Sequence, residues 1–221
     1  MITVHHLDNS RSHRVLWLLE ELALPYQVVL HQRDPLTMLA PPALRKVHPL
    51  GKAPVILDDG RVIAESGAII DHIVTQHGAG RLVPPVGTDE RLRYTHWLHH
   101  AEGSAMPPLL LKLVFGRLAS RVPFPIRPIA RGIAAATQRV LVDPQLKLHA
   151  DYWEAELSRS SWFAGAEFTA ADIQMSYPLE AFAARSGIAD SYPRVLSFLA
   201  TIRARPAYQR AIEHGGPLTP L

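Results

Sequence analysis

The sequence has 221 residues, of which 48% are hydrophobic and 19% are charged, a composition typical of a globular protein that buries a full core. The formal net charge is only +3 and the 23 Lys and Arg residues are scattered, so neither a nucleic acid nor a membrane surface is indicated as a partner. The absence of cysteine excludes disulfides, thiolate-bound metals and CxxC redox chemistry. Any thiol chemistry must therefore use the sulfur of another molecule.

The N-terminal sequence, MITVHHLDNSRS, lacks the charged start and the apolar core of a signal peptide. No apolar run along the chain approaches the length that a membrane-spanning helix needs. From these two features we expect a cytoplasmic protein with no membrane partner.

The N-terminal part of the chain predicts a strand, a helix and a second strand. Residues 2–7 are β-prone and end at the sequence DNS (residues 8–10), which offers turn residues and N-cap candidates, so we expect a helix to begin there. Pro25 ends this helix, and residues 26–30 form the next strand candidate, which predicts a βαβ unit with a parallel pair. On the solvent side of the helix we expect Arg14, Glu20 and Glu21.

The next stretch predicts an antiparallel hairpin followed by a helix. Residues 32–47 contain three prolines and should be irregular, with one short helix. The apolar runs 55–57 and 61–64 flank the turn sequence DDG, which is a strong hairpin signal. A helix then runs from about residue 66 to 77. The sum is βαβ plus ββα, a mixed sheet with helices on its faces.

The start of this second helix is suited to an anionic ligand. Ser66 is a good N-cap, and the unpaired N–H groups after it, with the positive end of the helix dipole, favour a carboxylate or a phosphate. Pro54 cannot donate to a strand ladder, so it implies an edge, a bulge or a cis bond. A cis Ala53–Pro54 bond would present the backbone of Ala53 to an extended peptide. The alternative is a plain hairpin followed by a capped helix.

The second half of the chain predicts helices alone. Residues 78–87 are rich in Gly and Pro, which indicates a linker. We place this linker at residues 79–87, between a domain of residues 1–78 and an all-helical domain of residues 88–221. Thr169 as N-cap with Asp172 three residues later, and Phe168 facing Ile173, predict a capped helix start. We assign a structural role to this motif.

The histidines do not complete a metal site by their spacing. His96, His99 and His100 have helical spacing, but no HExxH pattern and no further carboxylate set accompanies them, so we expect no metal. Ser66 also lacks the G-x-S-x-G context of a hydrolase nucleophile, and no Gly-rich phosphate loop is present.

Ser10 is the remaining candidate for chemistry, at the junction of the first strand and the first helix. Its alternative role is a plain helix cap. A hydroxyl donor beside a helix N-terminus can stabilise a ligand thiolate. Lowering a thiol pKa from ~8.5 by about two units requires roughly 2.7 kcal/mol, which one charge-assisted hydrogen bond and a helix dipole can supply.

Four motifs in order resemble the glutathione S-transferase family, over nearly the whole chain. They are SRSHRVLWLLEEL at residues 10–22, GKAPVIL at 51–57, ESGAIIDH at 65–72 and FTAADIQM at 168–175. The sequence is similar to cytosolic, bacterial-like members with a serine-type N-terminal motif. The resemblance implies a thioredoxin-like α/β N-terminal domain followed by an all-helical bundle.

The resemblance implies a role for each motif residue in binding glutathione. Glu65 and Ser66 would bind the γ-glutamyl end, Ala53 would pair with the cysteinyl backbone through the bend at Pro54, and Lys52 would face the glycyl carboxylate.

The residue that activates the sulfur is less defined by the motif. Ser10 ahead of Arg14 is similar to the activating serine of serine-type members, and Ser12 is its rival. The NSRS run departs from the common Ser-Pro-containing versions, so Asn9 or Arg11 can share the task.

The resemblance also implies an electrophile pocket between the domains, lined by Glu102, Met106 and Phe115, although the last two are equally suited to the bundle core. The implied activity is conjugation of glutathione, as co-substrate, to a small hydrophobic electrophile, or glutathione-dependent reduction of a peroxide. The implied assembly is a homodimer that uses the helix after Glu65 and the first long bundle helix. The alternative is a non-catalytic transferase-like scaffold that binds a protein or sequesters ligands.

Overall fold

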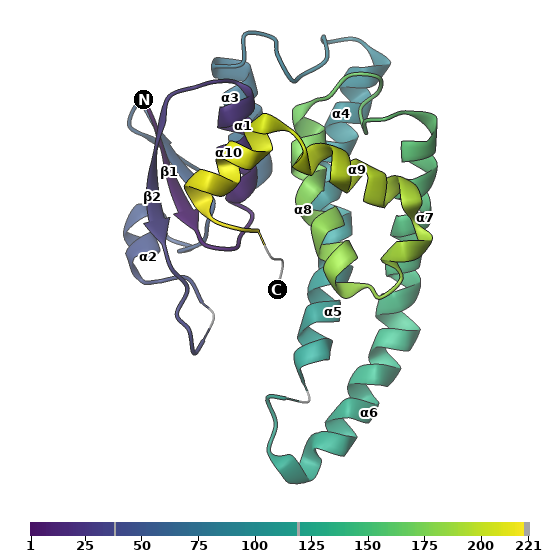
Figure 1. The fold of residues 1–221 in the computed structure, drawn as a ribbon. Helices are drawn as coiled ribbons and strands as arrows, with labels where there is room; N and C mark the ends of the chain where they lie inside the picture. The colour runs from purple at the N-terminus through teal and green to yellow at the C-terminus, as the bar shows by residue number, and fades with distance from the viewer. Residues whose placement is uncertain (38, 119, 219–221) are drawn as a thin grey trace.

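The computed structural model describes residues 1–37, 39–118 and 120–218, and these residues form a small sheet followed by a set of helices (Figure 1). The N-terminal elements are β1 (Ile2–Leu7), α1 (His13–Glu21), β2 (Tyr26–His31), α2 (Ala43–Val47), β3 (Val55–Asp58), β4 (Arg61–Ala64) and α3 (Ser66–Gln76). The elements that follow are α4 (Asp89–His100), η1 (Ala101–Ala105), α5 (Met106–Leu118), η2 (Phe124–Ile126), α6 (Arg127–Thr137), η3 (Gln138–Val142), α7 (Asp143–Arg159), α8 (Ala170–Arg185), η4 (Ala189–Ser191), α9 (Pro193–Arg203) and α10 (Pro206–Gly215).

The four strands form one mixed sheet in the order β2-β1-β3-β4. β1 is parallel to β2, with Ile2 opposite Tyr26, and antiparallel to β3, with Val4 opposite Ile56. The predicted βαβ plus ββα arrangement is therefore confirmed, and with the helices that follow it gives the expected thioredoxin-like plus helical fold. Val4 and Ile56 are fully buried, and they belong to one apolar core that continues into the helical half.

The first helix begins later than the sequence indicated, and its solvent side was wrongly predicted. α1 begins at His13, and Ser12 occupies its N-cap position without a side-chain cap hydrogen bond. Arg14, expected in solvent, is fully buried. The side chains of Glu20 and Glu21 are only 12% and 10% exposed. All three are covered because segments from the C-terminal half pack against α1, and local periodicity does not report such contacts.

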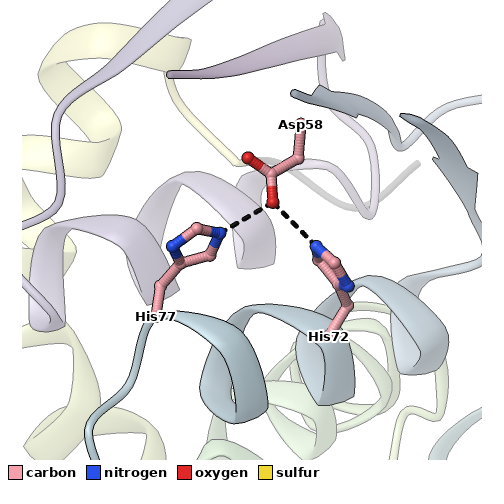
Figure 2. A group of neighbouring side chains, drawn as sticks. All are labelled: Asp58, His72 and His77. Carbon is pink, nitrogen blue, oxygen red and sulfur yellow. Dashed lines mark hydrogen bonds and ion pairs between the residues drawn. The ribbon is translucent and has the colours of Figure 1, made fainter. Parts of the chain in front are cut away.

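The hairpin and α3 follow the prediction closely. β3 and β4 pair around the DDG turn, and the Ala53–Pro54 peptide bond is cis. Gly51 has φ +58°, and a Cβ there would lie 2.6 Å from Arg45 Cγ, so the turn before Lys52 requires glycine. At the far end of α3, His72 and His77 both contact Asp58 at the end of β3 (Figure 2).

The chain from residue 88 onward is helical within the described residues, as predicted, but its last helix returns to the N-terminal half. α10 packs against α1 and β2, next to the sheet in Figure 1. Arg205, just before α10, binds Glu21 with an Nε–Oε1 distance of 2.5 Å, and Arg210 binds Glu20 at 2.6 Å. The proposed boundaries at residues 78 and 88 stay a prediction, and α10 belongs spatially with the sheet.

Asp172 holds the start of α8, as the motif predicted. Its carboxylate accepts hydrogen bonds from the backbone N–H groups of Phe163 and Thr169, both at 2.8 Å, and from the Thr169 hydroxyl at 3.1 Å. Asp172 is fully buried, and burial raises its pKa to about 6 against the effect of these hydrogen bonds. In the described part of the chain, no helix has both the length and the apolar character that crossing a membrane requires.

Candidate functional site

A cavity of about 230 Å³, called here the Lys52 cavity, lies at the start of α3. It is lined by Arg11, His48, Leu50, Lys52, Ala53, Pro54, Ala64, Glu65, Ser66 and Glu102. All five residues predicted to bind glutathione are therefore gathered on one cavity. Its wall combines two cations, two carboxylates and the cis peptide bond, which suits a small zwitterionic ligand more than an apolar one.

The start of α3 presents two residues to this cavity in different ways. Glu65 is exposed and precedes the helix with φ 71°, a left-handed conformation that is unusual outside glycine. Ser66 is the first helical residue and is buried, and its Oγ accepts a hydrogen bond of 2.9 Å from Arg14 Nη2. Ser66 was predicted as the N-cap, and the structure shifts that position to Glu65.

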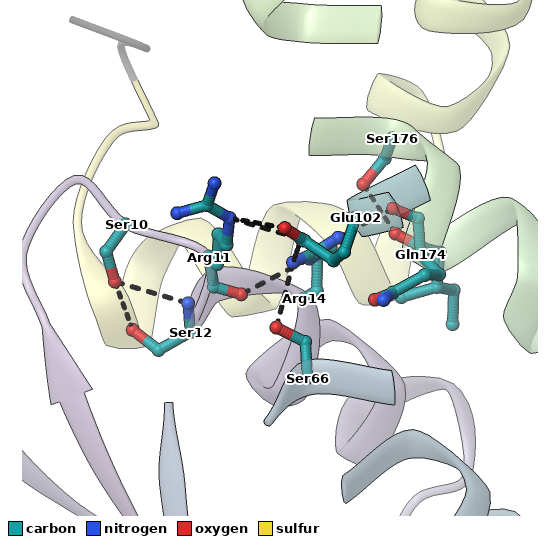
Figure 3. A network of polar contacts seen from close by, with 9 residues as sticks. Ser10, Arg11, Ser12, Arg14, Ser66, Glu102, Gln174 and Ser176 are labelled. Carbon is teal, nitrogen blue, oxygen red and sulfur yellow. Dashed lines mark hydrogen bonds and ion pairs between the residues drawn. The ribbon is translucent and has the colours of Figure 1, made fainter. Parts of the chain in front are cut away.

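Arg14 is the centre of the hydrogen-bond network that supports the start of α3 (Figure 3). Its guanidinium donates to Gln174 O at 2.7 Å, to Ser66 Oγ, and to Glu102 Oε1 at 2.5 Å. Arg11 binds the same Glu102 carboxylate, with an Nε–Oε2 distance of 3.0 Å. Burial alone would raise the pKa of Glu102, but the Arg14 and Arg11 guanidinium groups outweigh it and hold that pKa below its usual range. The carboxylate is therefore ionised at neutral pH, and the network joins α1, α3, η1 and α8.

Glu102 reaches the network from a π-helical segment, η1, between α4 and α5. Such segments insert an extra residue into a helix and are frequent at functional sites. Pro107 and Pro108 follow in the first turn of α5, and neither has an N–H to bond a carbonyl of the preceding turn. This proline pair is the local sequence signal for the irregular turn.

The two other predicted electrophile liners lie elsewhere. Met106 is 4% exposed and belongs to the apolar core, and Phe115 packs against that core half-buried. Neither lines the Lys52 cavity. A second, larger cavity of about 650 Å³, the α3–α4 cavity, is lined by both Glu65 and Glu102 on the side facing α4.

Ser10 and Ser12 do not line the Lys52 cavity, and their hydroxyl groups are bound inside the protein. Because Gly215 O accepts only, His6 Nε2 donates to it at 2.9 Å, and His6 Nδ1 is left to accept from Ser12 Oγ at 2.9 Å. Burial lowers the pKa of His6, which agrees with a neutral ring carrying one N–H. Ser12 Oγ also accepts from Leu7 N, at 3.1 Å, and Leu7 O is a second acceptor for its proton, at 3.2 Å. Ser10 must then donate its proton to Ser12 Oγ, 2.7 Å away.

Arg11 is the residue of the NSRS run that reaches the Lys52 cavity. Its side chain is 35% exposed. Figure 3 shows its two Nη groups turned away from Glu102, while Nε binds that carboxylate. The sequence analysis considered Arg11 only as a secondary contributor, because a motif does not tell which side chain of a turn points into a cavity.

Two family models match the chain. The glutathione S-transferase N-terminal domain matches residues 10–76, and the glutathione S-transferase C-terminal domain matches residues 131–212. Glutathione S-transferase 3 of Schizosaccharomyces pombe is 35% identical over 96% of this chain and 87% of its own length. The chain belongs to the glutathione S-transferase family. Glutathione S-transferase 1 of Saccharomyces cerevisiae is 32% identical over 96% of this chain and 94% of its own.

Solved structures of glutathione S-transferases share the fold. A glutathione S-transferase from Actinobacillus pleuropneumoniae has a TM-score of 0.81 and 31% identity, covering 99% of this chain and 94% of that chain. A glutathione transferase family member from Pseudomonas fluorescens has a TM-score of 0.74 and 25% identity, covering 96% of this chain and 92% of that chain. Its structure holds two glutathione molecules.

Proposed function

We propose that this chain is a glutathione transferase that binds glutathione in the Lys52 cavity and ionises its thiol for attack on a small hydrophobic electrophile. The observation that carries the proposal is the gathering of Lys52, Ala53, Pro54, Glu65 and Ser66 on one cavity whose floor is held by Arg14. The family relationship supports the same activity.

The charges of the cavity match the two ends of glutathione. Its γ-glutamyl end carries an ammonium and a carboxylate, which would bind Glu65 and the N–H groups with the hydroxyl at Ser66. Its glycyl carboxylate would face Lys52, which is exposed at the cavity rim. Between them, the backbone of Ala53 before the cis bond would pair with the cysteinyl backbone, which leaves the thiol on the Arg11 side.

We assign the stabilisation of the thiolate to Arg11 rather than to a serine hydroxyl. The proton of Ser10 is directed to Ser12 and that of Ser12 inward to His6 Nδ1 or Leu7 O, whereas the guanidinium of Arg11 lines the cavity and carries a positive charge. A cation close to a thiol lowers its pKa. Ser10 stays the alternative, since rotation of its hydroxyl would release the proton it shares with Ser12.

The thiolate formed in this way would attack an electrophilic carbon placed beside Arg11 and Glu102 and displace its leaving group as an anion. With an organic peroxide, it would attack the O–O bond and release the alkoxide, which takes up a proton, and a second glutathione would convert the sulfenic acid formed to glutathione disulfide and water. We also propose a cytoplasmic homodimer in which a second copy covers the α3–α4 cavity, because that face holds a broad hollow between two long helices. Light scattering at micromolar concentration tests the assembly. A mass near 24.5 kDa, that of one chain, would contradict the dimer.

Titration calorimetry with glutathione, together with a conjugation assay on a generic aryl halide, tests the function. We expect Glu65→Ala and Ser66→Ala each to weaken glutathione binding more than tenfold, because each removes a partner of a charged group, worth about 1.5–3 kcal/mol. The matched control is Glu213→Ala, an exposed glutamate on α10. Unchanged affinity in both cavity variants would move the site elsewhere, and binding without turnover of any electrophile or peroxide would favour the scaffold.

A further inference from the structure

A second group of side chains lies outside the glutathione site, at the opposite end of α3. His72 Nε2 and His77 Nε2 lie 2.8 and 2.7 Å from the same oxygen, Asp58 Oδ2 (Figure 2). One ligand atom from each of the three residues lies within 4.8 Å of the others. His72 is on α3, His77 directly follows it, and Asp58 ends β3. Two segments that are separate in sequence thus direct three potential ligand atoms to one point.

The Asp58 carboxylate is buried and incompletely paired. Its side chain is 6% exposed, and among the described residues nothing donates a hydrogen bond to its Oδ1. A buried carboxylate normally pairs with a cation or coordinates a metal. Among the described residues, the groups that contact it are two imidazole rings, each partly open to solvent.

We propose that Asp58, His72 and His77 form a binding site for a divalent transition-metal ion of the Zn²⁺ type. Two imidazole nitrogens and one carboxylate oxygen are a donor set that Zn²⁺ accepts, with a water molecule in the remaining position. Tetrahedral coordination at Zn–N and Zn–O distances of about 2.0–2.2 Å separates the ligand atoms by roughly 3.3 Å. The present N···O distances therefore have to widen by about half an ångström, which the two partly exposed rings permit.

An ion at this site would connect the end of β3 to the end of α3. The β3–β4–α3 unit carries the Lys52 cavity at its other end, through Pro54 before β3 and Glu65 before α3. The ion would hold the C-terminal ends of β3 and α3 together and stabilise the folded chain by an amount that rises with the logarithm of the free metal concentration once this exceeds the Kd. The role is structural, so the proposal does not depend on glutathione chemistry.

The site is distinct from the histidines that the sequence analysis considered for metal. His96, His99 and His100 are on α4, and His96 and His100 stack on each other, with their ring centroids 5.5 Å apart. His100 Nε2 also accepts a hydrogen bond of 3.1 Å from Trp153 Nε1, which occupies that ligand atom. In the described residues, the Asp58 group is the set in which three potential ligand atoms, two imidazole nitrogens and one carboxylate oxygen, converge.

The test is titration of tag-free, chelator-treated protein with Zn²⁺, followed by calorimetry and by thermal unfolding. We expect one tight Zn²⁺ per chain and an unfolding midpoint several degrees higher with Zn²⁺ than with chelator. His72→Ala and His77→Ala should each weaken this binding at least tenfold and remove the shift in the midpoint. His99→Ala, which removes an exposed histidine on α4, is the matched control. It should keep both the Zn²⁺ affinity and the shift in the unfolding midpoint.

Co²⁺ gives a second measurement that a purely structural effect of the substitutions would not reproduce. Its visible absorption changes when protein ligands replace water in the inner sphere, so the parent and His99→Ala should show the change and the two site variants should not. Equal Zn²⁺ affinity in the parent, His72→Ala and His77→Ala would overturn the proposal. A parent whose Co²⁺ spectrum stays that of the aqueous ion would also overturn it.

Discussion

The starts of α1 and α3 both place a serine at a helix N-terminus, but the two regions use it in opposite ways. At α1, the hydroxyls of Ser10 and Ser12 are directed inward to His6, whose other nitrogen binds Gly215 at the end of α10. At α3, Ser66 accepts from Arg14 and faces the Lys52 cavity beside exposed Glu65. The residue type is the same in both, and the partners that packing supplies decide which helix start remains available to a ligand.

The largest expected effect concerns the arginine that supports the start of α3. Arg14→Met should lower the free energy of unfolding by about 3 kcal/mol or more, because Gln174 O and Ser66 Oγ lose a buried donor and Glu102 loses its closer cation. Urea denaturation measures the loss. Arg11→Met is the matched control, since it removes a partly exposed partner of the same carboxylate and should cost below about 1 kcal/mol. Equal losses in the two variants would show that the floor of the cavity does not depend on Arg14.

A third helix start, that of α8, sharpens the comparison because no ligand is expected there. Asp172→Ala should cost about 1–3 kcal/mol of stability, since Phe163 and Thr169 lose their acceptor, without weakening glutathione binding in the folded variant. Asp143→Ala, also in the first turn of a helix but paired with Lys112 at a partly exposed site, should cost less. Loss of glutathione affinity in a fully folded Asp172→Ala would contradict the structural role.

Asp172 should also make the stability of the folded chain depend on pH. Burial raises the pKa of Asp172 from its ordinary 3.8 to about 6, so the folded chain holds this proton more tightly than the unfolded chain. The stability that Asp172 contributes is therefore complete below about pH 4 and declines as the pH rises to about 6. We expect the stability difference between the parent and Asp172→Ala to narrow over that window, measured by urea denaturation at several pH values. A stability difference that widens with rising pH would mean that the pKa of Asp172 is lowered on folding, and it would contradict the raised pKa.

The hydroxyl groups at the start of α1 should contribute less to stability than Arg14 does. Ser12→Ala should cost about 1–2 kcal/mol, because fully buried Ser12 bonds both His6 Nδ1 and Leu7 N. Ser10→Ala should cost less, since among the described residues its hydroxyl bonds Ser12 Oγ and the backbone N–H of Ser12. Thermal unfolding of the two variants compares them. A larger loss in Ser10→Ala would mean that the hydroxyl chain does not run inward as the structure has it.

Features with local causes were predictable from the sequence. The DDG turn, Pro54 before β3, the acidic start of α3 and the Asp172 cap all depend on residues within a few positions of one another. They predicted the sheet and the hairpin, and the family resemblance added the five glutathione-binding candidates that the structure gathers on the Lys52 cavity.

Features that depend on distant partners were not predictable in the same way. Arg14 is buried because Glu102 and Gln174, 88 and 160 positions along the chain, bind it. The hydroxyl of Ser12 is directed inward because α10 brings Gly215 next to His6, where a Cβ on residue 215 would lie 3.0 Å from the ring. Helical periodicity contains no signal for such contacts, so it could not predict which side of α1 faces the cavity.

The most direct test of the account is the pKa of glutathione bound in the Lys52 cavity. The ultraviolet thiolate absorption of bound glutathione, titrated against pH in the parent, Arg11→Met, Ser10→Ala and Ser12→Ala, measures it for each variant. We expect the parent to hold the thiol pKa well below its free value of ~8.5, and Arg11→Met to raise it by a unit or more, equivalent to about 1.4 kcal/mol per unit. The two serine variants should shift it less. A shift of a unit or more in Ser10→Ala, with none in Arg11→Met, would contradict the account and make the serine hydroxyl the donor to the sulfur.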